Sequence, residues 1–167
     1  NAIPQAMLRM PGNTKAIRAL ERMGTPPLRG QDLFVQRRWL SHYRGDTWAI
    51  DVTQVLAIGL RAPEYSLFDF VRFIRGAQYS NRLVWTELMK VNLLQEIHRL
   101  EIPVHFFTGR HDYTAAFALA EEFCASLEAP HKSIAWFENS AHMPNVEEPE
   151  EFQRRLIALG AQLCRGT

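Results

Sequence analysis

The sequence predicts an α/β protein in which a helical region precedes a short unit of alternating strands and helices. Residues 13–98 carry apolar side chains at helical spacing and show no convincing strand pattern. Beyond Leu100, two short apolar runs, 102–108 and 133–137, are each followed by a helical stretch. Strands and helices that alternate in this way favour a parallel sheet. We therefore expect two regions, residues 1–98 and 99–167.

The helical region is predicted from the spacing of its apolar side chains, which favours helices over residues 15–23, 32–43, 48–60, 67–74 and 81–91. The first is expected to end at Gly24 and the prolines that follow it. Ser66 and Asp69 have the spacing of a capping box, and Ser80 with Asn81 is expected to open the fifth helix.

The second region reads as strand, helix, strand, helix. The run Ile102–Thr108 is almost continuously apolar, which suits a strand buried on both faces. A helix is expected over 114–127, a second strand over 133–137, and a last helix over Pro149–Leu163 with proline and acidic residues in its first turn. This order predicts parallel strands joined by a right-handed crossover.

The composition is that of an ordinary globular protein, with 167 residues, 47% of them apolar, and a formal net charge of +1. The balanced charge argues against a nucleic-acid partner. No segment approaches the roughly 20 consecutive apolar residues of a membrane helix, so we expect no membrane partner. Cys124 and Cys164 are too few for a disulfide framework, which predicts buried thiols and a cytoplasmic location.

A carboxylate and an imidazole follow the two predicted strands. Asp112 lies just past the first strand and His142 just past the second. Because parallel strands lie about 4.8 Å apart and end at the same edge, these side chains could reach hydrogen-bonding distance. An acid that orients an imidazole is half of a nucleophile–base–acid relay. Alternatively, Asp112 only caps the helix at Thr114 and His142 is an ordinary loop residue.

The other histidines give no metal site. His42, His98 and His131 are isolated and lack the spacing of metal ligands, and His105 within the first strand suits a packed, hydrogen-bonded role. Arg110 and His111 are expected to be solvated or structural. We expect neither a metal nor a cofactor.

The residues that carry Asp112 and His142 form a joint pattern. Gly-Arg-x-Asp follows the first strand, and Ser-x-His-x-Pro with Glu-x-Pro-x-x-Phe follows the second. This pattern resembles the C-terminal part of the α/β-hydrolase fold family over roughly residues 100–163. The resemblance implies that residues 1–98 form a helical cap. The segment from Gly24 to Pro27 and the Arg-rich helix after it are similar to caps of the proline-iminopeptidase-like branch.

The resemblance implies a serine-type hydrolase that cleaves ester or amide bonds of a small substrate. Asp112 would be the acid and His142 the base of its triad. Four cap aromatics, although more often core than ligand cage, are candidate pocket residues: Phe68, Phe70, Phe73 and Trp85. A cap carboxylate could bind a substrate amino group, with the candidates Glu64, Asp69 and Glu87.

The sequence departs from the family because it contains no Gly-x-Ser-x-Gly elbow for a nucleophile. The nucleophile, whether Ser, Asp or Cys, is therefore expected outside this sequence. We expect the chain alone to be inactive, and to pair with the N-terminal half of the hydrolase or with itself, since two strands bury too little to form a stable sheet. The alternative is a non-catalytic cap-bearing fragment that binds a partner by strand addition.

Overall fold

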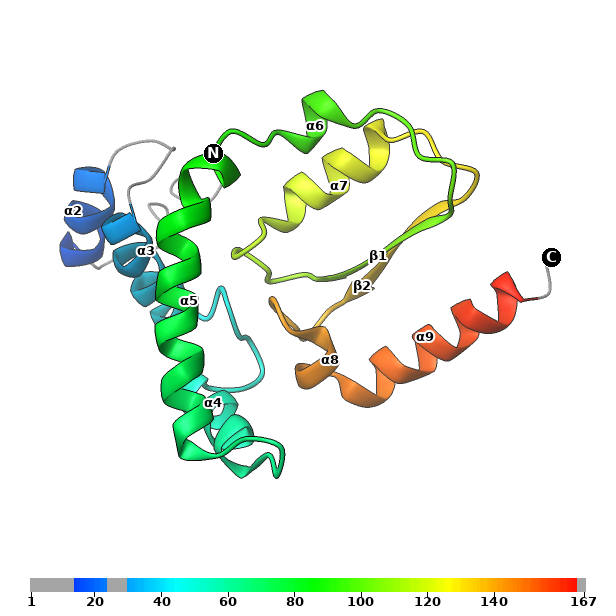
Figure 1. The fold of residues 1–167 in the computed structure, drawn as a ribbon. Helices are drawn as coiled ribbons and strands as arrows, with labels where there is room; N and C mark the ends of the chain where they lie inside the picture. Colours follow the sequence, from blue (N-terminus) through cyan, green and yellow to red (C-terminus); the bar gives the residue numbers. More distant parts are fainter. Residues whose placement is uncertain (1–13, 24–29, 165–167) are drawn as a thin grey trace. The chain divides into compact units, whose positions relative to one another are not determined.

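The computed structural model describes residues 14–23 and 30–164 (Figure 1). The predicted end of the first helix, at Gly24 and the prolines after it, lies outside these residues. None of the helices in the described ranges is both long enough and apolar enough to cross a lipid bilayer.

The described chain divides into two compact units. The units do not follow the chain strictly. The segment Arg44–Ala49 belongs to the second unit, although the residues after it, Ile50–Glu96, belong to the first. The first unit holds the described residues up to Tyr43 together with Ile50–Glu96, and the second holds Arg44–Ala49 and the chain from Ile97 onward. The functions predicted for residues 1–98 and 99–167 stay predictions.

The described part of the first unit is helical, as its periodicity predicted. The helices are α2 (Thr14–Met23), α3 (Gly30–His42), α4 (Val52–Arg61), α5 (Leu67–Leu88) and the short α6 (Leu93–Glu96). Helix α2 contacts α3, and α3 contacts α5. Ala16 and Leu40 are the buried apolar side chains recorded in this unit, so its described core is small.

Helix α4 begins at Val52, four residues later than the sequence predicted. The Asp51 side chain accepts a hydrogen bond from the Thr53 N–H at 2.8 Å, and the Gln54 side chain accepts one from the Asp51 N–H at 2.7 Å. This capping box satisfies N–H groups of the first turn and fixes the start of the helix. The expected start at Trp48 was wrong because Trp48 and Ala49 lie with the second unit.

Helix α5 is one continuous helix of 22 residues. The predicted capping box at its start is confirmed, because Ser66 accepts from the Asp69 N–H and Asp69 accepts from the Ser66 N–H. The prediction that Ser80 and Asn81 open a separate helix was wrong. Serine and asparagine cost only a fraction of a kcal/mol inside a helix, so a helix can continue through them as well as begin at them.

The aromatic residues of α5 are less buried than a core assignment requires. No residue of the helix is buried, and the Phe68 and Phe73 side chains are largely exposed. Phe70 and Trp85 are half-buried. The Phe70 ring packs against α4, where it lies 3.2 Å from the position of a Cβ on Gly59. The core assignment was therefore wrong for Phe68 and Phe73.

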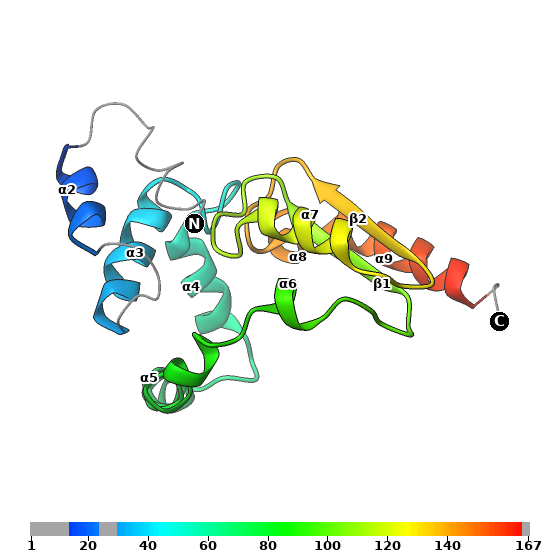
Figure 2. The same cartoon turned by 90° about the horizontal axis from the view of Figure 1, so that it is seen from above.

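The second unit contains a parallel pair of strands, as predicted (Figure 2). Strand β1 (Val104–Gly109) pairs with β2 (Lys132–Phe137) in a register that runs from Val104↔Lys132 to Gly109↔Phe137. Burial on both faces is reached only at the carboxyl end of β1, where Thr108 and Gly109 are buried. The rest of β1 is half-buried because, among the described residues, it pairs with one strand only.

A helix packs on each face of the strand pair. Helix α7 (Phe117–Ser126) packs on one face, where the Phe123 ring lies 6.0 Å from the Phe106 ring. Helix α9 (Pro149–Leu163) packs on the other face through Phe152, whose ring lies 5.3 Å from Phe107 and 5.7 Å from the fully buried Phe137. The alternation of side chains along the strands places Phe106 and Phe107 on opposite faces.

The termini of the helices in this unit differ from expectation in two places. Helix α7 begins at Phe117, not Thr114, because the residue before it, Ala116, has a φ of 41° in the left-handed region. A short unpredicted helix, α8 (Pro144–Glu147), precedes α9. Helix α9 has proline and two glutamates in its first turn, as predicted.

The two cysteines form no disulfide with each other. Cys124 is buried in α7, as predicted. Cys164 is exposed, so its predicted burial was wrong; it lies at the C-terminal cap of α9, beyond the turns that pack on the sheet.

Candidate active site

Asp112 and His142 lie together at the carboxyl ends of the two strands. The Oδ2 atom of Asp112 is 3.0 Å from the Nδ1 atom of His142. The Asp112 side chain is 9% exposed and the His142 side chain is 47% exposed. The structure therefore places a nearly buried carboxylate behind an imidazole that reaches solvent.

The turn after β1 orients the Asp112 carboxylate. Its Oδ1 atom accepts hydrogen bonds from the N–H groups of Thr114 at 2.8 Å and Ala115 at 3.0 Å. The Asp112 backbone carbonyl accepts a further bond from the Phe117 N–H at 2.9 Å. Oδ1 therefore holds the turn before α7, and Oδ2 meets His142. Asp112 does not cap a helix at Thr114, because α7 begins only at Phe117, and its role in a relay stays a prediction.

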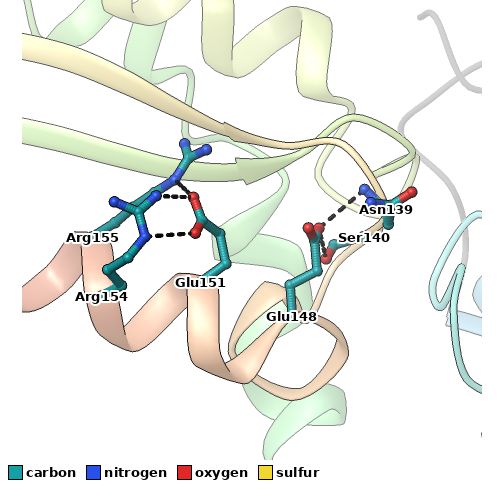
Figure 3. Close-up of polar contacts among 6 residues, drawn as sticks. All are labelled: Asn139, Ser140, Glu148, Glu151, Arg154 and Arg155. Carbon is teal, nitrogen blue, oxygen red and sulfur yellow. Dashed lines mark hydrogen bonds and ion pairs between the residues drawn. The ribbon is translucent and has the colours of Figure 1, made fainter.

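Two consecutive glutamates hold the loop that carries His142. Glu147, at the end of α8, accepts from the Ala141 N–H at 2.7 Å. Glu148 accepts from the Asn139 N–H at 3.0 Å and from the Ser140 hydroxyl at 2.6 Å (Figure 3). Hydrogen bonds to a carboxylate are among the stronger ones in proteins, so these contacts restrict the loop.

A segment from the first half of the chain completes this region; we call Arg44–Ala49 the strap. The Gly45 carbonyl accepts from the Tyr113 N–H at 3.0 Å, and the Asp46 carbonyl accepts from the His142 N–H at 3.1 Å. The strap therefore bonds to the backbone of both loops, the one that carries the acid and the one that carries the imidazole.

An aromatic contact adds to the strap. The Trp48 ring stacks on the His111 ring with 3.6 Å between ring centroids and an interplanar angle of 9°. Sequence reasoning missed the strap entirely. The local signal was the pair Gly45-Asp46, which is typical of a turn between helices, but nothing in that pair indicates its distant partners.

Arg110 links the two loops on their outer side. Its guanidinium donates to both carboxylate oxygens of Glu138, at 3.2 and 2.9 Å, and lies 3.9 Å from the centre of the Trp136 ring. The hydrogen bond from Arg110 lowers the pKa of Glu138. Arg154 and Arg155 lower the pKa of Glu151 in the same way in the first turn of α9 (Figure 3). Both ion pairs are therefore present at neutral pH and are lost only in acid.

Close backbone approach at Gly109 brings the two loops together. A Cβ at this position would lie 2.0 Å from the Ala141 carbonyl oxygen and 2.4 Å from that of Ser140. The His111 N–H also donates to the Ser140 carbonyl at 3.0 Å. Only glycine permits this approach, so the glycine of the Gly-Arg-x-Asp pattern has a steric role.

Replacing Gly109 with alanine is expected to lower the free energy of unfolding by about 3 kcal/mol, the upper part of the range for overpacking in a close-packed region. Chemical denaturation of the purified chain measures the change. The matched control is Gly160→Ala in α9, where a Cβ meets nothing within 4 Å and the change should stabilise by roughly 0.5–1 kcal/mol. Equal midpoints for the two variants would contradict the steric role.

Four serine side chains of the described residues make hydrogen bonds within the fold. Ser133 is 2.8 Å from the Nδ1 atom of His105, which confirms the hydrogen-bonded role predicted for that histidine. Ser66 caps α5, Ser126 bonds to the Phe123 carbonyl and Ser140 donates to Glu148. Among the described residues, no group of three or more His, Cys, Asp or Glu side chains could hold a metal ion.

The candidate substrate residues all lie in the first unit: Phe68, Phe70, Phe73, Trp85, Glu64, Asp69 and Glu87. Two of the carboxylates are engaged locally. Asp69 is in the capping box, where the Ser66 hydroxyl lowers its pKa, and Glu87 pairs with Lys90 at 2.7 Å. The roles of these residues in a pocket stay predictions.

Two curated proteins of Bacillus subtilis (strain 168) are similar to this chain. The first, named probable aminopeptidase YbaC, is 32% identical over 97 residues, which are 58% of this chain and 30% of that protein. The second, named AB hydrolase superfamily protein YclE, is 35% identical over 65 residues, which are 39% of this chain and 23% of that protein. The matched part spans less than a third of either relative.

No protein-family model and no solved structure matches the chain. The two similar proteins are both named as hydrolases or peptidases. The helices and the parallel β1–β2 pair are compatible with part of an α/β fold. At the level of family, this chain resembles the α/β hydrolases.

Proposed function

We propose that this chain is the C-terminal portion of a serine-type α/β-hydrolase that cleaves ester or amide bonds of a small substrate. The observation that carries the proposal is the 3.0 Å contact between Asp112 Oδ2 and His142 Nδ1 at the carboxyl ends of two parallel strands. The similarity to a probable aminopeptidase and to an AB hydrolase superfamily protein supports it.

In this proposal each side chain of the pair has a distinct role. An ionised Asp112 carboxylate only accepts, so Nδ1 of His142 would carry the hydrogen in their 3.0 Å contact. General-base chemistry would then run through Nε2, which takes the proton from a nucleophile and later gives it to the leaving group. Asp112 would hold this tautomer and stabilise the imidazolium. The nucleophile would come from residues outside this sequence.

The first unit would serve as the cap over the substrate. Phe70 and Trp85, half-buried on α5, and the exposed Phe68 and Phe73 would supply its apolar lining. An aminopeptidase-like substrate presents an ammonium group, which needs an acceptor. Glu64 suits that role better than Asp69 or Glu87, since the latter two already pair with Arg72 and Lys90.

The chain as given is expected to hydrolyse a short acyl nitrophenyl ester no faster than a buffer blank, because the relay lacks its nucleophile. The same protein expressed with the residues encoded upstream of Asn1 should turn the ester over, and a serine-directed phosphonate should abolish that turnover. Phosphonate-sensitive turnover by the chain as given would contradict the assignment of the nucleophile to another segment.

The edge of β1 favours a second candidate, a non-catalytic module that binds a partner by strand addition. Within the described ranges, β1 has a paired strand on one side only. An unpaired strand edge presents backbone donors and acceptors to a further strand. That strand could come from the N-terminal half of the hydrolase or from a second copy of this chain. A Gly-x-Ser-x-Gly sequence encoded upstream of Asn1 would favour the hydrolase, and a start codon directly before Asn1 would favour the module.

A further inference from the structure

We propose that Glu147 is a positioning residue, which sets the orientation of the His142 imidazole by joining the strap to the loop that carries it. The inference rests on the proposed function only for its effect on catalysis, because the geometry itself involves no nucleophile and no substrate. Glu147 lies outside the acid–base pair and acts through the backbone on either side of it.

One carboxylate meets three backbone N–H groups. The Oε1 atom of Glu147 accepts from the N–H groups of Trp48 and Ala49, and its Oε2 atom accepts from that of Ala141 at 2.7 Å. The donors on the strap are 99 and 98 residues away from Glu147 in sequence. Because a carboxylate only accepts, it can satisfy all three donors at once.

These bonds define the direction of the His142 side chain. Ala141 directly precedes His142, and its N–H is held by Glu147. The His142 N–H is held in turn by the Asp46 carbonyl of the strap. Two consecutive peptide groups are thereby fixed, and the strap that fixes the second is itself held by Glu147. The Cα–Cβ bond of His142 then points the imidazole at Asp112.

The neighbouring Glu148 provides a matched comparison. Both of its contacts, to the Asn139 N–H and to the Ser140 hydroxyl, use the same oxygen, Oε2 (Figure 3). A glutamine at 148 can place its carbonyl oxygen there and keep both bonds. A glutamine at 147 cannot keep all three bonds, because both oxygens of Glu147 accept from N–H groups. One of these oxygens would become an NH₂ group, which donates and cannot accept.

The tautomer of His142 reports the effect without requiring activity. In the ¹⁵N-labelled chain, long-range ¹H–¹⁵N spectra recorded at alkaline pH, where imidazole is neutral, should show the Nδ1–H tautomer. Glu148→Gln should retain it. Glu147→Gln should lose roughly half or more of it, because the tautomer depends on the hydrogen bond at Nδ1. An unchanged tautomer in a folded Glu147→Gln chain would overturn the inference.

Amide exchange in the unaltered chain keeps the inference testable if Glu147→Gln does not fold. The N–H groups of Trp48, Ala49 and Ala141 should exchange more slowly than those of unbonded surface residues. Exchange of all three at the rate of an unstructured peptide would overturn the inference, since Glu147 would not be holding them.

Kinetics of the protein that carries its nucleophile separate this inference from the proposed function. Glu147→Gln should lower kcat about 10²-fold with little change in KM, as expected when a reacting group is misplaced by about 1 Å. A shifted tautomer in Glu147→Gln with full turnover in His142→Ala would sink the proposed function and leave the positioning role intact. Lost turnover in His142→Ala, together with an unshifted tautomer in Glu147→Gln, would support the proposed function and overturn the positioning role.

Discussion

Replacing His142 with alanine should lower kcat of the nucleophile-bearing protein by about 10³-fold or more, the loss expected for a member of a catalytic triad. The imidazole would be the only group that carries the proton from nucleophile to leaving group, so nothing replaces it. Because 47% of the side chain is exposed, its removal should leave the fold and the free energy of unfolding nearly unchanged. Steady-state ester hydrolysis, with chemical denaturation alongside, measures both.

The matched control is His131→Ala. His131 is an exposed residue in the same unit, directly before β2, and its side chain takes no part in the site. Its backbone carbonyl accepts from the Val104 N–H, a bond that the substitution preserves. Turnover in His142→Ala that matches the His131→Ala control would show that the base lies elsewhere.

Replacing Asp112 with asparagine should cost about as much as the equivalent change in a serine-protease triad, on the order of 10⁴-fold in kcat. The asparagine oxygen can still accept from the Thr114 and Ala115 N–H groups, so the turn is preserved. Its amide group then faces Nδ1 of His142, which must present a lone pair there. The hydrogen moves to Nε2, and the imidazole can no longer accept a proton from the nucleophile.

The tautomer of His142 also reports on this substitution in the chain as given. Asp112→Asn should convert the Nδ1–H signal pattern to that of Nε2–H, whereas the unaltered chain retains Nδ1–H. Asp112→Ala is the comparison for the structural role, since it removes both the contact to His142 and the two backbone bonds. It should therefore also unfold at a lower denaturant concentration. A loss of less than a few-fold in kcat for Asp112→Asn would place the acid elsewhere.

The parts of this structure that could be predicted from sequence are those set by neighbouring residues. Apolar spacing predicted the helices, and Ser66 with Asp69 predicted the start of α5 from a hydrogen-bond exchange across three residues. The approach of Asp112 and His142 was predictable for a related reason. Each directly follows a strand, and parallel pairing brings the carboxyl ends of neighbouring strands to one edge.

The parts that could not be predicted involve partners far apart in the chain. Trp48 and Ala49 were assigned to a helix because their neighbours Ile50 and Val52 fit an apolar periodicity. Their N–H groups instead bond to Glu147, and this tertiary contact outweighs a local preference of a few tenths of a kcal/mol per residue. Burial was misjudged for Phe68, Phe73 and Cys164 because apolar character does not say which face of a helix finds a partner.

By itself, the amino-acid order determined most of the helices and both strands, though not all of their limits. It also determined that the strands run parallel and that an acid and an imidazole follow them at a common edge. Only the tertiary structure decided how the imidazole is oriented, since that depends on the strap and on Glu147, which sequence separates by nearly a hundred residues. Local propensity acts between residues a few positions apart, whereas orientation at a site is decided by hydrogen bonds that exist only once distant segments have met.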